Sequence, residues 1–412
     1  MVRDTVFVED EPAMHLLVIA VSFPAPGTPI PSVVIGEQVR LLCERVERIT
    51  VLSPTTFVPA FMRGFRRVAR QASLPDRYQM VEGRCEVLFP RYIKAPGAMF
   101  LRWTTAQWCR IVDQTIAQCT KTRPVSILHA NFGTVSSWAT ICAAKQYHIP
   151  CVVTYQGTDV HTVLAHHHKG WQLCRDSFRL ADLNLSASRS LENILRLHAQ
   201  PTGRCEVLLR GVDQTQFFPS SELTTDPHVL FVGRVETAKG VFDLLSAWTK
   251  VRHACPDAVL TVVGPDHTGG RFLQKAHLFG IDRSIKLTGP LPSPAVADLM
   301  RQSRLLCLPS HGEGTPNCVM EALSCGLPVV ATRVGGIPDI VEYARTGLLI
   351  DQGDIEGLAV SLVTLLRDPY RCASMGQAAH AFARVHLDAR KTVSRLVELY
   401  DELISHSRER SA

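Results

Sequence analysis

Two glutamates, eight positions apart, are the side chains whose spacing most suggests chemistry. Glu313 lies in a loop of small and turn-forming residues, 309–317, and Glu321 lies in a predicted short helix, 318–325. Such a loop and a helix N-terminus offer unpaired N–H groups and partial positive charge, which suit phosphate or sugar oxygens. A carboxylate beside them accepts hydrogen bonds from vicinal hydroxyls, each worth roughly 1.5–3 kcal/mol. The stretch therefore predicts a sugar or phosphate site; the alternative is two solvated surface charges.

A second candidate site follows the predicted strand 229–232, which opens the second half of the chain. Arg234 and Lys239 flank a turn that runs into a predicted helix from Val241. An arginine binds a phosphate in a fork, a lysine binds it as a point charge, and the helix N-terminus adds partial positive charge. The arrangement predicts a diphosphate site; the alternative is a surface loop with two unrelated cations.

Buried strands that alternate with helices must position these loops. Near-continuous apolar runs, such as 15–22 and 305–308, are typical of parallel strands that are buried on both faces. Their alternation with helical segments favours an α/β fold with doubly wound sheets, and 412 residues are enough for two domains. The predicted strands are 15–22, 49–52, 229–232, 258–264, 285–289, 305–308, 329–331 and 340–349, and 151–159 is predicted as a strand followed by a loop.

The composition is that of an ordinary globular protein. The residues are 46% hydrophobic and 20% charged, and the mild net charge of +6 indicates no nucleic-acid partner. None of the 13 cysteines forms a CxxC pair, and the consecutive histidines 166–168 lack metal-ligand spacing, so no metal site is predicted. No signal peptide and no apolar run that could span a bilayer are visible, so a cytoplasmic protein with reduced thiols is expected.

The stretch around the two glutamates resembles the signature of family GT4, the retaining nucleotide-sugar glycosyltransferases of GT-B fold. The family motif reads EG-x-P-N-x-x-x-E-A, and the matching residues here are Glu313, Gly314, Pro316, Asn317, Glu321 and Ala322. The segment 233–240 is similar to the family's GR-x-x-x-x-KG. The stretch 208–219 resembles the linker between the family's two domains, with Arg210 in place of the usual asparagine.

The resemblance implies an α/β GT-B fold, in which two Rossmann-like doubly wound domains face a central cleft. Residues 1–220 would form the N-terminal, acceptor-side domain, and residues 221–390 would form the C-terminal domain that binds the nucleotide-sugar donor. The C-terminal helix, about 391–412, would pack back on the first domain. The implied activity is that of a hexosyltransferase, which moves a sugar to an acceptor hydroxyl with retention at the anomeric carbon.

The resemblance also implies roles for the donor-site residues. Arg234 and Lys239 would hold the diphosphate, and Glu321 would bind the ribose hydroxyls. Glu313, with the amides that follow it, would bind the donor sugar, and Leu291 would contact the base. The residues expected to bind the donor are Gly233, Arg234, Lys239, Leu291, Glu313, Gly314, Thr315, Pro316, Asn317 and Glu321. No cofactor and no divalent metal are expected, because the two cations take the place of a metal.

The expected catalytic residues are Glu313, Asp159 and Gln156, the last two on the acceptor side. The segment 156–159 reads Gln-Gly-Thr-Asp where family members have His-Gly-x-Asp, and glutamine cannot act as an acid or base near neutral pH. No side chain is expected to be a nucleophile. The resemblance implies a front-face mechanism, in which a donor phosphate oxygen takes the acceptor proton.

A basic and apolar segment, 57–70, suggests peripheral contact with an anionic membrane. Arg63, Arg66, Arg67 and Arg70 lie at helical spacing among apolar neighbours, as in an interfacial helix. The alternative is an ordinary helix whose arginines point to water. The segment favours a lipid-linked or membrane-proximal saccharide as the acceptor, in polysaccharide or glycolipid assembly at the inner face of the membrane; small soluble acceptors are the alternative.

Three other functions of this fold stay open. A retaining phosphorylase would need a lysine placed for pyridoxal phosphate, and no such context is visible. A nucleotide-sugar epimerase of GT-B fold would release an altered donor sugar without any acceptor. A non-catalytic nucleotide-sugar-binding protein would show no turnover, and the glutamine at position 156 keeps this alternative open.

Overall fold

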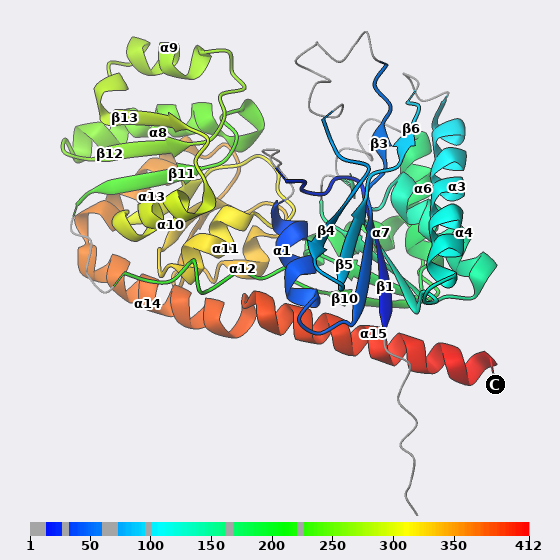
Figure 1. Ribbon diagram of the computed structural model, residues 1–412. Coiled ribbons are helices and arrows are strands. Elements are labelled where there is room, and N and C mark those ends of the chain that lie inside the picture. Colours follow the sequence, from blue (N-terminus) through cyan, green and yellow to red (C-terminus); the bar gives the residue numbers. More distant parts are fainter. Residues whose placement is uncertain are drawn as a thin grey trace, which may run out of the picture. The chain divides into compact units, whose positions relative to one another are not determined.

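The computed structural model describes residues 14–26, 33–59, 73–94, 100–157, 159–160, 168–220 and 226–411. The chain forms two compact units. Unit 1 contains Met1–Ser186, Ile194–Glu206 and Val393–Ala412, and unit 2 contains Ala187–Asn193 and Val207–Thr392. The helices and strands of both units carry the labels of Figure 1.

Unit 1 is built on an eight-stranded sheet whose central strands are buried on both faces. All six residues of β1 (His15–Ala20) are buried, as expected for the interior of a parallel sheet. The strands run in the order β10-β9-β8-β7-β1-β2-β5-β4; β4 is antiparallel to β5, and the pairs from β5 to β9 are parallel. The other strands are β2 (Arg48–Leu52), β4 (Arg77–Val81), β5 (Cys85–Leu88), β7 (Ile127–Asn131), β8 (Cys151–Tyr155), β9 (Leu183–Ser186) and β10 (Arg204–Val207).

The helices of unit 1 form where apolar residues recur at helical spacing. In α3 (Leu101–Thr120), the buried Trp108, Val112 and Ile116 lie at intervals of four, which places them on one face. This helix packs beside α4 (Val135–Tyr147), as Figure 1 also shows. Other helices here are α1 (Val33–Leu42), α6 (His168–Leu180), α7 (Arg189–His198) and α15 (Ala389–Ser411), of which α7 and α15 have their first residues in unit 2.

A buried histidine joins α15 to the sheet of unit 1. The ring nitrogens of His129, in β7, lie 2.5 Å from the Tyr400 hydroxyl and 2.7 Å from the Thr154 hydroxyl. Burial lowers the pKa of His129 to about 3, because a charged imidazole would lose its hydration there. The side chain is therefore a neutral link between the sheet and the long helix that runs beside it in Figure 1.

We expect the protein to lose stability between pH 7 and pH 5. In the unfolded chain His129 takes up a proton near pH 6.5, whereas the folded side chain stays neutral down to about pH 3, so acid favours unfolding. This residue alone accounts for a loss of about 2 kcal/mol at pH 5. Urea unfolding at pH 7 and pH 5 measures this change. In His129→Gln, the decrease in the free energy of unfolding between the two pH values should be smaller by about this amount. An equal drop in both proteins would contradict the assignment.

Unit 2 is built on a six-stranded parallel sheet in the order β13-β12-β11-β14-β15-β16. Every residue of β14 (Leu305–Leu308) and β15 (Val329–Thr332) is buried, which explains their near-continuous apolar sequence. The other strands are β11 (His228–Val232), β12 (Val259–Val263), β13 (Ile285–Gly289) and β16 (Gly347–Ile350). The helices are α8 (Val241–Ala254), α9 (Arg271–Leu278), α10 (Ser293–Gln302), α11 (Asn317–Ser324), α12 (Ile337–Ile340), α13 (Ile355–Arg367) and α14 (Pro369–His386) among the described residues.

The strand order brings particular loops together within each unit. In unit 2 the chain runs from β11 to β12 on one side, while β14 lies on the other side of β11. In unit 1 the same reversal lies between β1 and β7. Open α/β sheets bind ligands outside the carboxyl ends of the strands at such a reversal. The loops that follow β11 and β14 carry Lys239 and Glu313, so the fold brings the two predicted sites together.

The predicted α/β fold with doubly wound parallel sheets is confirmed. One predicted strand, 340–349, is wrong in its first part. Ile340 ends the short helix α12, whose start is favoured by Pro338, and the strand begins only at Gly347. Apolar residues at 340 and 341 pack in the core from a helix end and a loop, which a strand pattern does not distinguish.

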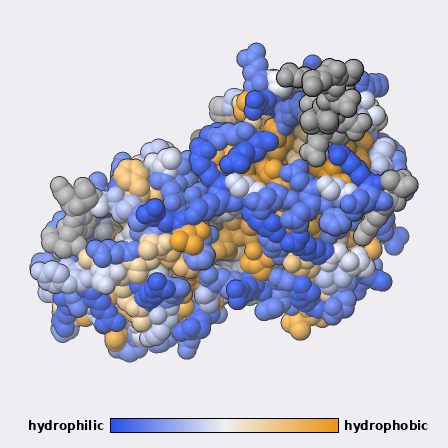
Figure 2. All heavy atoms as spheres, turned by 90° about the horizontal axis from the view of Figure 1, so that it is seen from below, coloured by the Kyte–Doolittle hydropathy of each residue, from blue (hydrophilic) through white to orange (hydrophobic). Residues whose placement is uncertain are grey.

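The face seen in Figure 2 is mostly hydrophilic, with hydrophobic patches. Exposed apolar side chains include Ile93 and Trp103, and the backbone of Ile93 exchanges two hydrogen bonds with Gln107 of α3, one turn after Trp103. No helix among the described residues is both long and apolar enough to cross a membrane. The predicted membrane-contacting side chains, Arg63, Arg66, Arg67 and Arg70, lie outside the described residues.

Candidate functional site

The turn after β11 and the loop after β14 are in direct contact within unit 2. The backbone N–H of His311 donates to the Ala238 carbonyl at 2.9 Å. Gly240, at a φ of +66°, lies so close that a Cβ there would be 1.8 Å from the Pro309 carbonyl oxygen. Only glycine fits both this conformation and this approach. The glycine thus lets the two loops meet at the point where the strand order reverses.

A buried ion pair joins these two loops. The Lys239 ammonium lies 2.6 Å from Oε1 of Glu313, and the side chains are only 18% and 8% exposed. The Ser310 hydroxyl donates to the same oxygen at 2.7 Å. Among the described residues, nothing hydrogen-bonds to Oε2 of Glu313. The pair is therefore fixed on one side and keeps an acceptor oxygen and ammonium hydrogens for a ligand.

Two glycines shape the loop that carries Glu313. The N–H of Gly336 donates to the Gly314 carbonyl at 2.6 Å. Gly335 has a φ of +56°, and a Cβ there would lie 1.8 Å from the Glu313 carbonyl oxygen. The Thr315 hydroxyl donates at 2.5 Å to the carbonyl of Ala187, which also belongs to unit 2. Backbone contacts on both sides therefore hold the Glu313–Thr315 segment in place.

The N-terminus of α11 lies directly after this segment and has no side-chain cap. Its N-cap residue, Pro316, makes no capping hydrogen bond. The Oδ1 atom of Asn317 is buried and has no hydrogen-bond partner in the described part of the chain. Glu321, one turn further along the helix, is half-buried. Uncapped amides at a helix start, with a buried polar atom beside them, are suited to ligand oxygens.

The second predicted cation is placed differently from Lys239. The Arg234 guanidinium is 58% exposed and lies 3.0 Å from the carboxylate of Glu236. The same carboxylate lies 3.7 Å from the His267 ring. Arg234 is therefore an exposed side chain of the β11 loop that a single surface ion pair holds.

Backbone contacts join the carboxyl ends of β11, β12 and β13. The N–H of Gly264 donates to the Gly289 carbonyl at 2.9 Å. A Cβ on Gly264, which has a φ of +140°, would lie 1.9 Å from the Gly233 carbonyl oxygen. Leu291 follows β13 and packs against the core of unit 2. The predicted base-contacting residue thus lies on the same edge of the sheet as the β11 loop.

In unit 1, the carboxylate of Asp159 is buried among backbone amides. It accepts hydrogen bonds from the N–H groups of Gly133 at 2.8 Å, Gln156 at 3.0 Å and Gly157 at 2.8 Å. The Gln156 side chain donates to Oδ1 of Asn131 at 3.1 Å. Asp159 thereby ties the loop after β8 to the loop after β7, and this places Gln156 beside the end of β7.

Burial raises the pKa of Asp159, and the amides that donate to it oppose part of that shift. Its side chain is only 3% exposed, and both of its oxygens accept hydrogen bonds. This geometry suits the holding of a loop better than proton transfer with a ligand. Its predicted role on the acceptor side stays a prediction, as does that of Gln156.

The structure brings the predicted donor-site residues together in unit 2 and holds Asp159 and Gln156 separately in unit 1. Sequence reasoning missed Ser310 as a hydrogen-bond partner of Glu313. It also missed the 2.7 Å contact between His311 and Asp243 in α8. The only sequence signal for these contacts was that Ser310 and His311 lie in the loop 309–317, which the sequence analysis had singled out. In the described part of the chain, no group of three or more potential metal ligands gathers.

Comparison with solved structures shows the fold. Sucrose-phosphate synthase (tll1590) from Thermosynechococcus elongatus superposes with a TM-score of 0.78 at 17% identity, covering 95% of this chain and all of that one. Anabaena Alr3699/HepE in complex with UDP gives a TM-score of 0.71 at 18% identity, with the same coverage. These neighbours have the GT-B fold, so the predicted fold class is confirmed.

Comparison of the sequence identifies the class of enzyme. Residues 226–368 match the family described as "Glycosyl transferases group 1", and this segment contains both Lys239 and Glu313. A relative from Bacillus subtilis (strain 168), named "Putative teichuronic acid biosynthesis glycosyltransferase TuaC", is 27% identical over 409 residues, which are 96% of this chain and all of the relative. The chain is a glycosyltransferase.

A second relative matches a large part of the chain. The N-acetyl-alpha-D-glucosaminyl L-malate synthase of Bacillus anthracis is 27% identical over 304 residues, which are 70% of this chain and 78% of the relative. The family match lies wholly within unit 2. The part of the sequence that matches the glycosyltransferase family is therefore the part that carries Lys239 and Glu313.

Proposed function

We propose that this glycosyltransferase moves a sugar from a nucleotide-sugar donor to an acceptor hydroxyl with retention at the anomeric carbon, as the GT4 resemblance implies. The observation that carries the proposal is the buried Lys239–Glu313 pair at the reversal of strand order in unit 2. A cation and a carboxylate held together beside uncapped amides offer donors for phosphate oxygens and an acceptor for sugar hydroxyls.

Lys239 and Arg234 would bind the donor diphosphate. The Lys239 ammonium uses one contact to orient itself on Glu313 and keeps further hydrogens for phosphate oxygens. The exposed Arg234 would leave Glu236 and bind in a fork. As the bond to the sugar breaks, negative charge grows on the leaving nucleoside diphosphate, and these cations would stabilise it. The proposal therefore needs no metal.

Glu313 and the start of α11 would bind the donor sugar. The Oε2 atom of Glu313 would accept a hydrogen bond from a sugar hydroxyl. The Oε1 atom would keep its hydrogen bonds from Lys239 and Ser310. The buried Oδ1 of Asn317 would gain a partner when ligand is bound. Glu321 would accept the ribose hydroxyls from its place one turn along the helix. The acceptor proton would pass to a donor phosphate oxygen, as in the front-face mechanism that the GT4 resemblance implies.

Uridine nucleotides are the first donors to test. Anabaena Alr3699/HepE was solved with UDP-glucose at 18% identity, and Staphylococcus aureus TarM was solved with UDP and alpha-GlcNAc-glycerol at 13% identity. The name of TuaC supports a role in cell-wall polysaccharide assembly. The acceptor would be a saccharide or a lipid-linked saccharide. The exposed Trp103 and Ile93, with the basic sequence 57–70, support peripheral contact with an anionic membrane.

Thermal unfolding with a panel of nucleotide-sugars and nucleoside diphosphates tests the donor site. A ligand that binds the folded state raises its apparent stability. We expect one nucleotide class to raise the melting temperature, and we expect Arg234→Ala and Glu321→Ala each to reduce that rise. The same rise in both variants would count against the site, and no rise with any nucleotide would favour a protein without this donor site.

Product analysis separates transfer from the alternatives. Incubation with the identified donor, with and without saccharide acceptors, should give a new glycoside only when acceptor is present. Proton NMR of that glycoside should show the anomeric configuration of the donor. A free altered nucleotide-sugar would indicate an epimerase, and binding without turnover on any acceptor would indicate a non-catalytic protein.

A further inference from the structure

A cavity of about 420 Å³ lies within unit 2 on the edge of the sheet opposite the Lys239–Glu313 pair. Arg304, which directly precedes β14, and Pro328, which directly precedes β15, line it. Parallel strands present their amino ends at one edge of a sheet and their carboxyl ends at the other. The cavity therefore lies at the amino ends of the two strands whose carboxyl ends lead to the Glu313 loop and to the Gly335–Gly336 pair.

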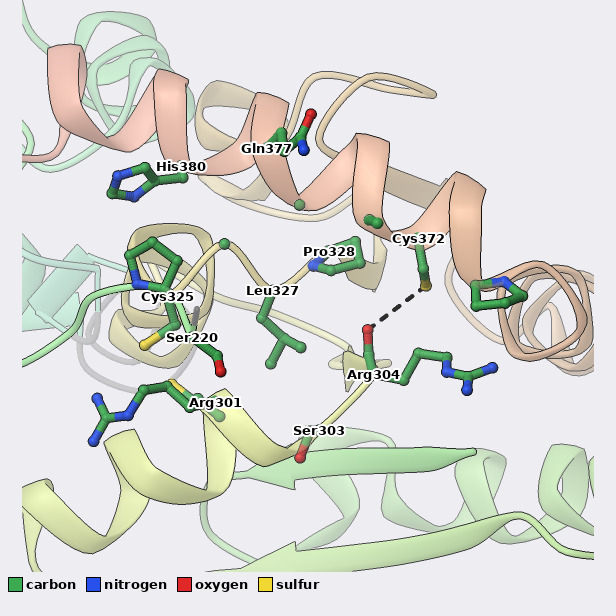
Figure 3. A pocket seen from close by; sticks show the side chains of 16 residues that line it. Ser220, Arg301, Ser303, Arg304, Cys325, Leu327, Pro328, Cys372, Gln377 and His380 are labelled. Carbon is green, nitrogen blue, oxygen red and sulfur yellow. Dashed lines mark hydrogen bonds between the residues drawn. The ribbon is translucent and has the colours of Figure 1, made fainter. Parts of the chain in front are cut away.

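Two arginines line the cavity, Arg304 and Arg301, and Arg301 is in ion-pair contact with Asp298. Figure 3 shows Leu327 in its middle, His380 of α14 and Arg301 of α10 toward one end, and Arg304 toward the other. No aspartate or glutamate is among the residues that line it. The cavity thus combines cationic groups with an apolar floor, which suits a small organic anion.

Arg304 is the buried cation in the wall of the cavity. Its side chain is only 6% exposed, and one of its N–H groups donates to the Leu366 carbonyl at 2.7 Å. Its Nε–H is buried and has no partner among the described residues, and no described carboxylate lies within ion-pair distance of it. A buried charge without a counter-charge is costly, and a guanidinium is well shaped to bind an oxyanion.

Neighbouring groups could bind the rest of such a ligand. His380 lies with Nδ1 3.0 Å from the Ser324 carbonyl, so Nδ1 carries a hydrogen and Nε2 is left for another partner. The Cys372 thiol already donates to the Arg304 carbonyl, as the dashed line in Figure 3 shows. Ala373, on the same face of α14, lines the cavity with only a methyl group. Space at Ala373 and charge at Arg304 together leave room for a ligand of metabolite size.

We propose that this cavity is a second ligand site, separate from the donor site, which binds a small metabolite through a phosphate or carboxylate group on Arg304. The proposal does not depend on the donor-site assignment, because the two sites share no residue. It gives the buried guanidinium an anionic partner that the described part of the chain does not supply.

Isothermal titration with four probes tests the proposal: inorganic phosphate, glucose 6-phosphate, succinate and neutral glucose. We expect a phosphate or carboxylate probe to bind at millimolar concentration and glucose not to bind. The phosphate and succinate arms decide which oxyanion is preferred. The binding should persist in folded Lys239→Met, because Lys239 does not line the cavity. Loss of binding in Lys239→Met, or no binding by any of the three anions, would overturn the proposal.

A matched pair of variants at Ala373 guards against effects on folding. Ala373→Gln and Ala373→Glu have nearly the same size, but only the glutamate brings a negative charge into the cavity. We expect binding to be weaker by about tenfold or more in Ala373→Glu than in Ala373→Gln, with equal melting temperatures. Arg304→Gln should abolish binding if it folds. Equal binding by the two Ala373 variants would refute an anion site here.

Discussion

Lys239→Met is expected to lower turnover by about 10²–10³-fold and to reduce the free energy of unfolding by about 3 kcal/mol. The loss of turnover follows from removing a charge that would stabilise the leaving diphosphate. The loss of stability has a different cause. Methionine keeps the length of the side chain, but the carboxylate of Glu313, only 8% exposed, would lose its counter-charge.

A double variant separates these two effects. In Lys239→Met with Glu313→Gln the buried charge is gone, so most of the stability should return while turnover stays low. Lys250→Met is the matched control, because its ammonium pairs with Glu356 where both side chains are at least half exposed. That variant should change stability by less than about 1 kcal/mol and leave turnover unchanged. Recovery of turnover in the double variant would contradict a role for Lys239 in binding the diphosphate.

Gly335→Ala is expected to displace the Glu313 loop and to remove most of the activity. Its φ of +56° is unfavourable for alanine, and the new Cβ would lie 1.8 Å from the Glu313 carbonyl oxygen. Since that contact is with backbone, the loop itself must move. We expect urea unfolding to show a loss of about 3 kcal/mol or more in the free energy of unfolding. This total is larger than the usual cost of an alanine in the left-handed conformation, which is about 1–2 kcal/mol.

Gly353→Ala is a control that separates the cost of the left-handed backbone conformation from the cost of the steric contact made by the new Cβ. Gly353 has a φ of +77° but no atom within 4 Å of an added Cβ. It should therefore show the conformational cost alone, with activity close to that of the wild type. If Gly335→Ala were no more harmful than Gly353→Ala, the contact between Gly335 and the Glu313 loop would not matter for the site.

Much of unit 2 could be predicted from sequence because its signals are local. The strand at 305–308 is an apolar run bounded by Arg304 and Pro309, and its bounds agree with the structure. The loops that bear Lys239 and Glu313 were predicted as separate sites. Parallel-sheet topology explains why they meet, since carboxyl ends of neighbouring strands share one edge.

Other features could not be predicted, because they depend on contacts between distant parts of the chain. The pairing of Lys239 with Glu313 joins residues 74 positions apart. The amides that surround Asp159 come partly from Gly133, in a different loop. The burial of Arg304 without a counter-charge is likewise invisible in a sequence, where an arginine after a helix is typical of the surface.

The most direct test of the donor site is a comparison of diphosphate and monophosphate binding. Isothermal titration would use the nucleoside diphosphate that stabilises the protein most in the panel, together with its monophosphate. The wild type should bind the diphosphate at least about tenfold more tightly. In Lys239→Met this preference should fall by about tenfold or more, while the monophosphate affinity stays near that of the wild type. A preference for the diphosphate as large in Lys239→Met as in the wild type would contradict the assignment of Lys239 to the donor diphosphate.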